Sequence, residues 1–189
     1  MTPQDEIVLI RNAQNGDRNA FGELVSLHAG ELMQILYRMY GNQQLAEDAV
    51  QKAFIQSWLQ LPSFQPRSSF RAWLVRIAIN AAIDMLRKEK RILTNEPEDF
   101  QLVDTNPGPE TVMIKKEHAK WVQSAIRCLP DASRAVLILR EYQELSYHEI
   151  AEILEIPIGT VMSRLNYARK ILKEKLAVQM QLSEEVINV

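Results

Sequence analysis

The sequence predicts an all-α protein made of two small helical domains joined by a flexible linker, and three observations support this. Apolar residues recur with the 3.6-residue helical period along most of the chain, and no stretch alternates as a strand would. Residues 94–109 lack any period and hold three prolines, a glycine and four acidic residues. Residues 146–166 have the pattern of a helix-turn-helix in the C-terminal domain. A chain of 189 residues is long enough for two such domains.

Four helices are expected before the linker. Residues that favour helix starts and stops mark the first three: Pro3 and Gly16, then Asp17 and Gly41, then Asn42 and Pro62. A loop with two prolines and three serines is expected at residues 61–69, and a fourth helix is expected at about residues 70–91. Together these elements form the first domain.

Two further helices are expected after the linker, near residues 110–129 and 131–142, with Pro130 between them. The helix-turn-helix then begins at Ser146, which forms a capping box with Glu149. Its second helix is expected over residues 158–176.

Four apolar positions support the helix-turn-helix interpretation. Ala151 is small enough for two helices to touch, and Ile156 fills the core beneath the turn. Val161 and Leu165 anchor the second helix. The polar and cationic residues left outside suit base edges and phosphates in a major groove: Thr160, Ser163, Arg164, Tyr167, and Lys170 or Arg169. An ordinary helical hairpin with a solvated face is the alternative.

The charge of individual segments differs from the net charge of the whole chain. The net charge is −2, from 22 basic and 24 acidic residues, and alone it argues against a polyanionic partner. Residues 67–91, however, hold seven basic residues against two acidic ones, and residues 157–189 hold five against three. Two basic segments in an acidic chain indicate two local contacts with phosphate, although each segment could also be a solvated helix face.

The first basic segment carries a polar stripe, in which Arg76, Asn80, Asp84 and Arg87 recur at helical spacing. Trp73 lies at the start of the stripe. An aromatic ring beside Arg and Asn is typical of single-stranded DNA binding, but a core position is the favoured interpretation of this ring.

No catalytic or metal-binding pattern is present, so neither an enzyme nor a cofactor is expected. The three histidines are scattered, and none has metal-ligand spacing to Cys128. Cys128 is interpreted as a small buried residue in preference to a redox sensor, and His28 and His148 as surface or capping residues. No stretch is apolar enough to insert into a membrane, and a single cysteine fits a soluble protein of the reducing cytoplasm.

Five motifs occur in order along the chain: Asp17-Arg-Asn-Ala-Phe21, Ala46-Glu-Asp-Ala-Val-Gln-Lys-Ala-Phe54, Phe70-Arg-Ala-Trp-Leu-Val-Arg-Ile-Ala-Ile-Asn80, Asp84-Met-Leu-Arg-Lys88, and Leu145-Ser-Tyr-His-Glu-Ile-Ala151 with Pro157-Ile-Gly-Thr-Val161. Together they resemble the extracytoplasmic-function (ECF) class of bacterial sigma factors. The resemblance covers the chain apart from the linker and about the last dozen residues.

The resemblance implies that residues 1–92 form sigma domain 2, residues 93–110 a linker and residues 111–189 sigma domain 4. Such a protein binds core RNA polymerase and promoter DNA, duplex at the −35 element and single-stranded at the −10 element. The residues that match the polymerase-binding stretch are Asp48, Gln51, Lys52 and Phe54. Those that match the −10 region are Phe64, Arg67, Ser68, Ser69, Arg71, Trp73, Arg76, Asn80, Arg87 and Lys88. Those of the −35 helix are Thr160, Ser163, Arg164, Asn166, Tyr167 and Arg169.

Several positions depart from the family pattern. Lys52 stands where Glu is usual, and the loop after Phe64 reads Gln-Pro-Arg-Ser-Ser in place of the commoner Arg-Gly-Asp/Glu type. Met162 and Tyr167 stand where Lys or Arg is common, and Asn166 where His or an aromatic residue is common. With fewer cations, the −35 contact is expected to depend less steeply on salt, and Asn166 is expected to favour an A·T pair.

The resemblance also implies control by an anti-sigma protein, and residues 178–189 are expected either to pack or to contact such a partner. Two rival functions remain open. One is a stand-alone helix-turn-helix regulator whose residues 1–92 sense a signal or dimerise. The other is an all-helical adaptor with no role in nucleic-acid binding.

Overall fold

A computed structural model describes residues 3–65, 69–93 and 110–187, and it describes side chains for 4–65, 69–88 and 119–177. Within these residues every regular element is a helix, so the predicted all-α class is confirmed. The N-terminal half holds α1 (Pro3–Gln14), α2 (Arg18–Tyr40), α3 (Gln43–Gln60), the 3₁₀ turn η1 (Leu61–Ser63) and α4 (Phe70–Leu93). The C-terminal half holds α5 (Glu110–Arg127), α6 (Asp131–Glu141), α7 (Tyr147–Leu154) and α8 (Ile158–Ile187).

Predicted capping residues begin α2 and α3, and Gly41 ends α2, whereas Pro62 lies within η1 after α3 has ended. Asp17 Oδ1 accepts hydrogen bonds from the Asn19 and Ala20 amides, at 2.8 and 3.2 Å. Asn42 Oδ1 accepts from the Leu45 amide at 3.0 Å. Each bond satisfies an amide that has no partner within its own helix. These boundaries are therefore set by local sequence.

One helix is longer than expected. The sequence predicted that the last helix ends near residue 176, but α8 continues to Ile187. Residues 177–187 contain neither glycine nor proline, so nothing in them stops a helix. The predicted linker at residues 94–109 lies outside the described residues.

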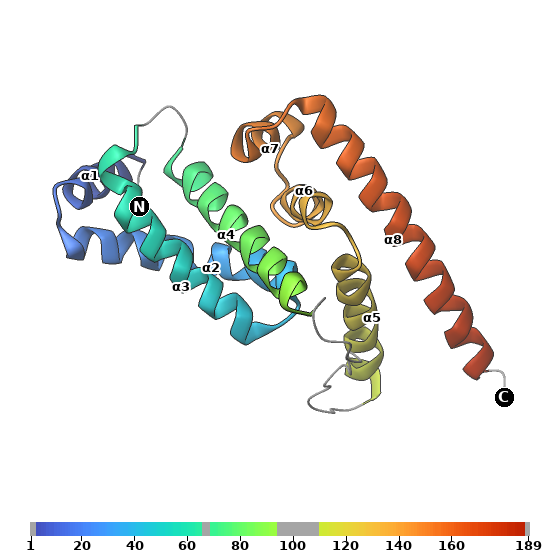
Figure 1. Ribbon diagram of the computed structural model, residues 1–189. Coiled ribbons are helices and arrows are strands. Elements are labelled where there is room, and N and C mark those ends of the chain that lie inside the picture. The colour runs from blue at the N-terminus through green and yellow to red at the C-terminus, as the bar shows by residue number, and fades with distance from the viewer. Residues whose placement is uncertain (1–2, 66–68, 94–109, 188–189) are drawn as a thin grey trace.

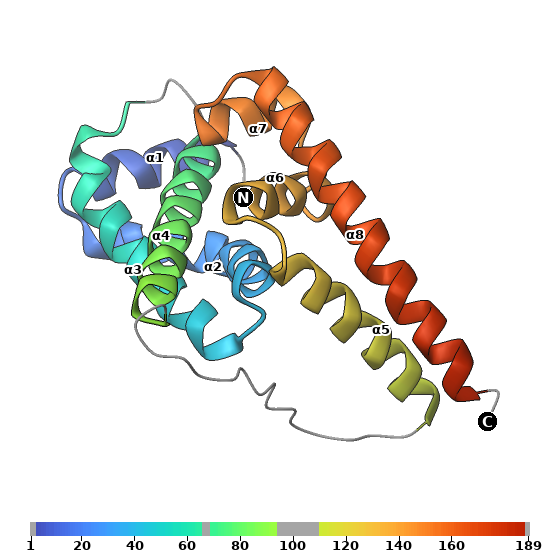
Figure 2. The same ribbon diagram turned by 45° about the vertical axis from the view of Figure 1, so that its right-hand side comes forward.

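The two halves pack against each other (Figures 1 and 2). In both views α1 to α4 gather on one side and α5 to α8 on the other, and α6 lies between α2 and α8. The buried apolar side chains form one continuous cluster that includes Leu36 and Ile79 of the first half and Ile138 and Leu165 of the second. Helix α2 contacts α5 and α6, and α4 contacts α6 and α7. A flexible linker alone would leave the orientation of the two domains open, but in this structure they share one apolar core and contact each other directly.

None of the helices in the described segments combines the length and the apolarity that a membrane crossing requires.

Candidate nucleic-acid interface

The helix-turn-helix begins with the predicted capping box. Ser146 Oγ accepts a hydrogen bond from the Glu149 amide at 3.2 Å, and Glu149 Oε2 accepts one from the Ser146 amide at 2.7 Å. Hydrogen bonds from the side chain and from the backbone amide of Ser146 favour the charged carboxylate of Glu149, so they lower its pKa, and the side-chain bond is the largest cause. The box fixes where α7 starts.

The turn between α7 and α8 is set by its backbone. Glu155 adopts a left-handed conformation (φ 52°), and its amide donates to the carbonyls of Ala151 and Glu152, which ends α7. The side chain of Ile156 packs against the core beneath the turn. Val161 and Leu165 are fully buried, so they anchor α8 as predicted.

The anchored side of α8 leaves one face in solvent. Residues one helical turn apart share this face, and the exposed ones are Met162, Ser163, Asn166, Tyr167 and Lys170. Met162 and Tyr167 are 47% and 48% exposed. Two further predicted −35 residues, Thr160 and Arg164, are half-buried beside this face. We call the five exposed residues the recognition face.

Arg169 is engaged within the protein. Its guanidinium donates to Glu141 of α6 at 2.7 Å, and this hydrogen bond raises the pKa of the arginine. The contact braces α8 against α6, so in this structure the guanidinium is held by Glu141. Lys170, the alternative considered from the sequence, is the cation on the recognition face.

The polar stripe on α4 is only partly free. Asn80, Arg87 and Lys88 are exposed, and Arg87 lies 3.9 Å from Asp84 in a weak, solvated pair. Arg71 and Arg76 make ion pairs instead. Arg71 pairs with Glu31, with Nε donating at 3.0 Å, and Arg76 pairs with Glu155 in the helix-turn-helix. The sequence did not indicate either partner.

Two aromatic rings at the start of α4 and one at the end of η1 form a small core. Phe64, Phe70 and Trp73 are 7%, 4% and 8% exposed, and their ring centroids lie 4.8 to 5.8 Å apart. The core interpretation of Trp73 is confirmed, and neither Phe64 nor Trp73 presents a ring face on which a base could stack. These rings instead pack Phe64, at the end of η1, against the first turn of α4.

Ser69 has a role that the sequence analysis missed. Its Oγ accepts a hydrogen bond from the Ala72 amide at 3.1 Å, so it caps α4. A serine directly before the helix was a readable signal for this. Arg67 and Ser68, the neighbouring predicted −10 residues, lie outside the described residues.

The predicted polymerase-binding residues on α3 divide into two groups. Asp48, Gln51 and Lys52 are exposed, whereas Phe54 is only 9% exposed and meets the ring of Phe21 edge-on. Phe54 is therefore a core residue and does not present its ring to a partner.

Two apolar residues on the same outer face were missed. Ile55 and Leu59 are 54% and 71% exposed, and they continue the row that begins at Asp48 and Lys52. Their helical spacing from those residues was the signal that could have identified them.

Cys128 corrects another expectation. The thiol residue was predicted to be buried, but it is exposed in the turn after α5, while its neighbour Leu129 is 1% exposed and occupies the core. In this turn only one of the two adjacent side chains points into the core, and it is the larger apolar one, Leu129. His28 lies half-buried, 2.9 Å from Glu6, whereas His148 is exposed as expected.

Among the described residues, no group of three or more His, Cys, Asp or Glu side chains is arranged to hold a metal ion.

A capped helix-turn-helix with an exposed recognition face is typical of DNA-binding proteins. The sequence matches the family described as Sigma-70 region 2 over residues 24–92 and the family described as Sigma-70, region 4 over residues 119–172. The ECF RNA polymerase sigma factor SigW of Bacillus subtilis is 36% identical over 176 residues, which are 88% of this chain and 94% of SigW.

Solved structures agree with this match. The structure of CnrH in complex with the cytosolic domain of CnrY has a TM-score of 0.68 and 28% identity, over 92% of this chain and 98% of that one. The sigma factor RpoE of Bartonella quintana, solved with the anti-sigma factor NepR, has a TM-score of 0.64 and 26% identity, over 84% and 97% of the two chains. The chain belongs to the ECF sigma factors of bacterial RNA polymerase. It therefore functions in promoter-specific initiation of transcription.

Proposed function

We propose that the two halves divide the work of initiation. Residues 1–92 act as sigma domain 2, which binds core polymerase and opens the −10 element, and residues 111–189 act as sigma domain 4, which reads the −35 element. Residues 93–110 join them. The matches to regions 2 and 4 support this division, because they fall within these two segments.

The observation that carries the −35 proposal is the recognition face of α8. The capping box and the buried Val161 and Leu165 hold this helix at a set angle to α7, so the exposed residues project together. Ser163 and Asn166 supply hydrogen-bonding groups for base edges, and Lys170 supplies a cation for phosphate.

The polymerase proposal rests on the outer face of α3. A row of exposed residues there combines the charged Asp48 and Lys52 with the apolar Ile55 and Leu59. Exposed apolar side chains in a row are typical of a protein interface. For the −10 element, the exposed part of the proposed contact is Asn80, Arg87 and Lys88, with Arg71 and Arg76 available once their ion pairs open.

The proposal extends to regulation, activity and location. An anti-sigma protein is the expected regulator, because RpoE of Bartonella quintana was solved with one. The chain acts without chemistry of its own, as a specificity factor in the cytoplasm where core polymerase works.

Run-off transcription with purified core polymerase on a genomic promoter library tests the proposal. We expect transcripts from a discrete set of promoters only when the full chain is added, and weaker transcription when Asn166 is replaced by Ala. A chain that shifts promoter duplex without polymerase would favour the stand-alone regulator. Failure to support transcription from any promoter would overturn the assignment.

A further inference from the structure

The side chain of Gln14, the last residue of α1, holds the segment that follows α3. Its Nε2 donates to the carbonyls of Leu61 and Phe64, at 3.1 and 2.8 Å, across 47 and 50 residues of chain. A primary amide carries two N–H bonds, so each carbonyl can receive one of them. Leu61 begins η1 and Phe64 directly follows it. We call these two hydrogen bonds the Gln14 clamp, because they join both ends of η1 to α1.

The clamp satisfies backbone groups that the turn itself leaves open. Leu61 and Phe64 are 0% and 7% exposed, and a buried carbonyl without a donor is costly. The Leu61 carbonyl also accepts from the Phe64 amide at 3.0 Å, which closes η1. Phe64 then turns into extended backbone (φ −63°, ψ 122°), so continuing the turn cannot supply a donor for its own carbonyl. The Gln14 amide supplies it.

The end of α1 that carries Gln14 is itself fixed. Gly16 adopts a left-handed conformation (φ 94°), and the Asp17 amide donates to the Asn12 carbonyl at 3.1 Å, which closes the end of the helix. Ala13, the neighbour of Gln14, is 3% exposed and lies in the core. Gln14 therefore projects from a backbone with a set position.

The other end of α1 reaches the same region through a histidine. Glu6 Oε1 lies 2.9 Å from His28 Nε2, and the His28 ring packs against Phe70, with ring centroids 5.5 Å apart. Phe70 in turn meets the ring of Phe64 edge-on at 5.8 Å. Helix α1 is thus tied to this small aromatic core twice, once through the Phe64 backbone and once through the Phe70 ring.

The segment that α1 holds leads into the proposed −10 contact. Gln65, directly after Phe64, is exposed, and so is Ser69, where α4 begins. The packing of Phe64 on Phe70 couples the end of η1 to the first turn of α4. The match to Sigma-70 region 2 begins at residue 24, so it assigns no role to α1.

We propose that α1 positions the −10 contact and that Gln14 is the positioning residue. The Gln14 clamp fixes Phe64, and the packed rings of Phe64, Phe70 and Trp73 carry that position to the start of α4. Gln14 acts through Phe64 and does not itself contact the promoter. A contact that distinguishes bases depends on such a supporting shell, because hydrogen bonds weaken steeply with distance and angle. The positioning role rests on the proposed −10 function of α4, whereas the clamp itself does not.

Three variants of the full chain separate these claims. Gln14→Met keeps a side chain of similar length without a donor. Gln14→Asn keeps the amide on a stem that is one methylene shorter, so it cannot span both carbonyls. Gln4→Met is the matched control, because Gln4 is exposed in the first turn of the same helix. Circular dichroism of each protein confirms that the helices remain.

Hydrogen exchange of the Phe64 amide in the full chain tests the clamp. This amide donates to the Leu61 carbonyl, so its exchange rate reports the opening of η1. We expect exchange to be about tenfold faster in Gln14→Met and Gln14→Asn, and unchanged in Gln4→Met. Equal rates in the parent chain and both Gln14 variants would overturn the clamp and the positioning role with it.

Transcription by the holoenzyme tests the positioning role. One promoter selected from the genomic library is compared with its single-base variants in the −10 and −35 elements. With Gln14→Met, the ratio of rates between the parent promoter and its −10 variants should fall about fivefold, while the −35 ratios stay unchanged. Gln4→Met should leave both sets of ratios unchanged.

Two outcomes would overturn the positioning role alone. If both sets of ratios fall alike, or if exchange accelerates while the −10 ratios stay the same, Gln14 only stabilises the fold. Failure of the parent chain to support any transcription would instead overturn the proposed function, and the −10 role of α1 with it. Faster exchange of the Phe64 amide in the Gln14 variants would still establish the clamp in that case.

Discussion

Phe54 and Leu59 lie five residues apart on α3 and face opposite environments. The Phe54 ring is 9% exposed and contacts Phe21, whereas Leu59 is 71% exposed on the outer face. Both are large apolar residues on α3, the helix that carries the proposed polymerase-binding residues. Their different environments predict different consequences when each is replaced.

Phe54→Ala should lower the free energy of unfolding by about 3 kcal/mol, because it leaves a cavity in the core. Leu59→Ser should change it by less than about 0.5 kcal/mol, because the side chain is already in solvent. Instead, Leu59→Ser should weaken association with core polymerase by about tenfold. Urea denaturation and a fluorescence binding assay measure the two effects.

Leu27→Ser is the matched control, because Leu27 is 46% exposed on α2, away from the outer face of α3. It should leave both stability and polymerase affinity unchanged. If Leu59→Ser binds polymerase as the parent chain does, the outer face of α3 is not the docking surface.

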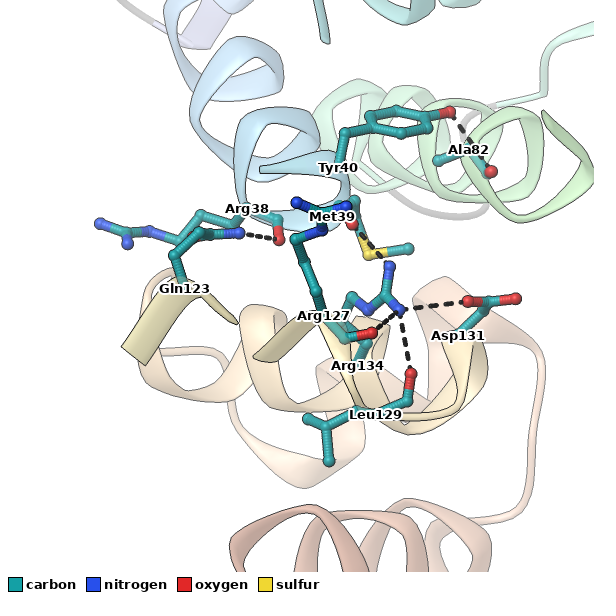
Figure 3. Close-up of polar contacts among 9 residues, drawn as sticks. All are labelled: Arg38, Met39, Tyr40, Ala82, Gln123, Arg127, Leu129, Asp131 and Arg134. Carbon is teal, nitrogen blue, oxygen red and sulfur yellow. Dashed lines mark hydrogen bonds and ion pairs between the residues drawn. The ribbon is translucent and has the colours of Figure 1, made fainter. Parts of the chain in front are cut away.

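Replacement of Arg134 should be strongly destabilising. Arg134→Met leaves the carbonyls of Met39, Arg127 and Leu129 without this donor and removes the ion pair with Asp131 (Figure 3), which we expect to cost about 3 kcal/mol. Urea unfolding of the full chain measures the loss. Arg18→Met, at an exposed position, should have little effect, and a comparable loss there would show that the assay does not report the buried contact.

The capping box should contribute measurably to stability. Ser146→Ala removes the acceptor of the Glu149 amide and should destabilise the C-terminal half by about 1 kcal/mol. Hydrogen exchange of the Glu149 amide gives the local effect, and it should be faster in the variant. Ser124→Ala, on an exposed face of α5, is the control and should leave that exchange rate unchanged.

The lowered pKa of Glu149 predicts a pH dependence. A carboxylate whose native pKa is below its ordinary value of 4.5 contributes stability that is present above pH 4.5 and is lost as the pH falls through the native pKa. The parent chain should therefore be more stable than Glu149→Gln at neutral pH, and the difference should shrink below pH about 4. Urea midpoints of both proteins, measured across this pH range, test the prediction. A difference in stability between the two proteins that stays constant with pH would contradict it.

Met162 should set the salt dependence of −35 recognition. The side chain is 47% exposed on the recognition face and carries no charge. Met162→Arg in the holoenzyme should steepen the slope of log affinity against log salt by about 0.9, the value for one added phosphate contact. Met162→Gln, which adds polarity without charge, should leave the slope unchanged. An unchanged slope with Arg would place residue 162 away from the DNA backbone.

Local features of the fold could be predicted from the sequence because they depend on neighbouring residues. The caps at Asp17, Asn42 and Ser146 each bond to an amide two or three positions ahead, so the motif alone identifies them. The buried anchors Val161 and Leu165 follow from helical period. The helix-turn-helix was predictable for these reasons.

Burial at particular positions was harder to predict. Cys128 and Leu129 are adjacent and both apolar, and only the packing of α5 and α6 decides that Leu129 enters the core. The same holds for Phe54 and Leu59, since helical period locates an apolar face without saying which neighbour covers it.

The sequence by itself therefore determined the helical class, the capped helix-turn-helix and the family to which the chain belongs. Only the tertiary structure decided that Arg134 reaches Met39 and that Glu155 reaches Arg76, across 95 and 79 residues of chain. The physical reason is that helix formation and capping are local, whereas a contact between distant residues depends on how whole helices pack. Arg76 belongs to a sequence pattern typical of DNA binding, but the packing of the helices places it in an ion pair with Glu155 of the same chain.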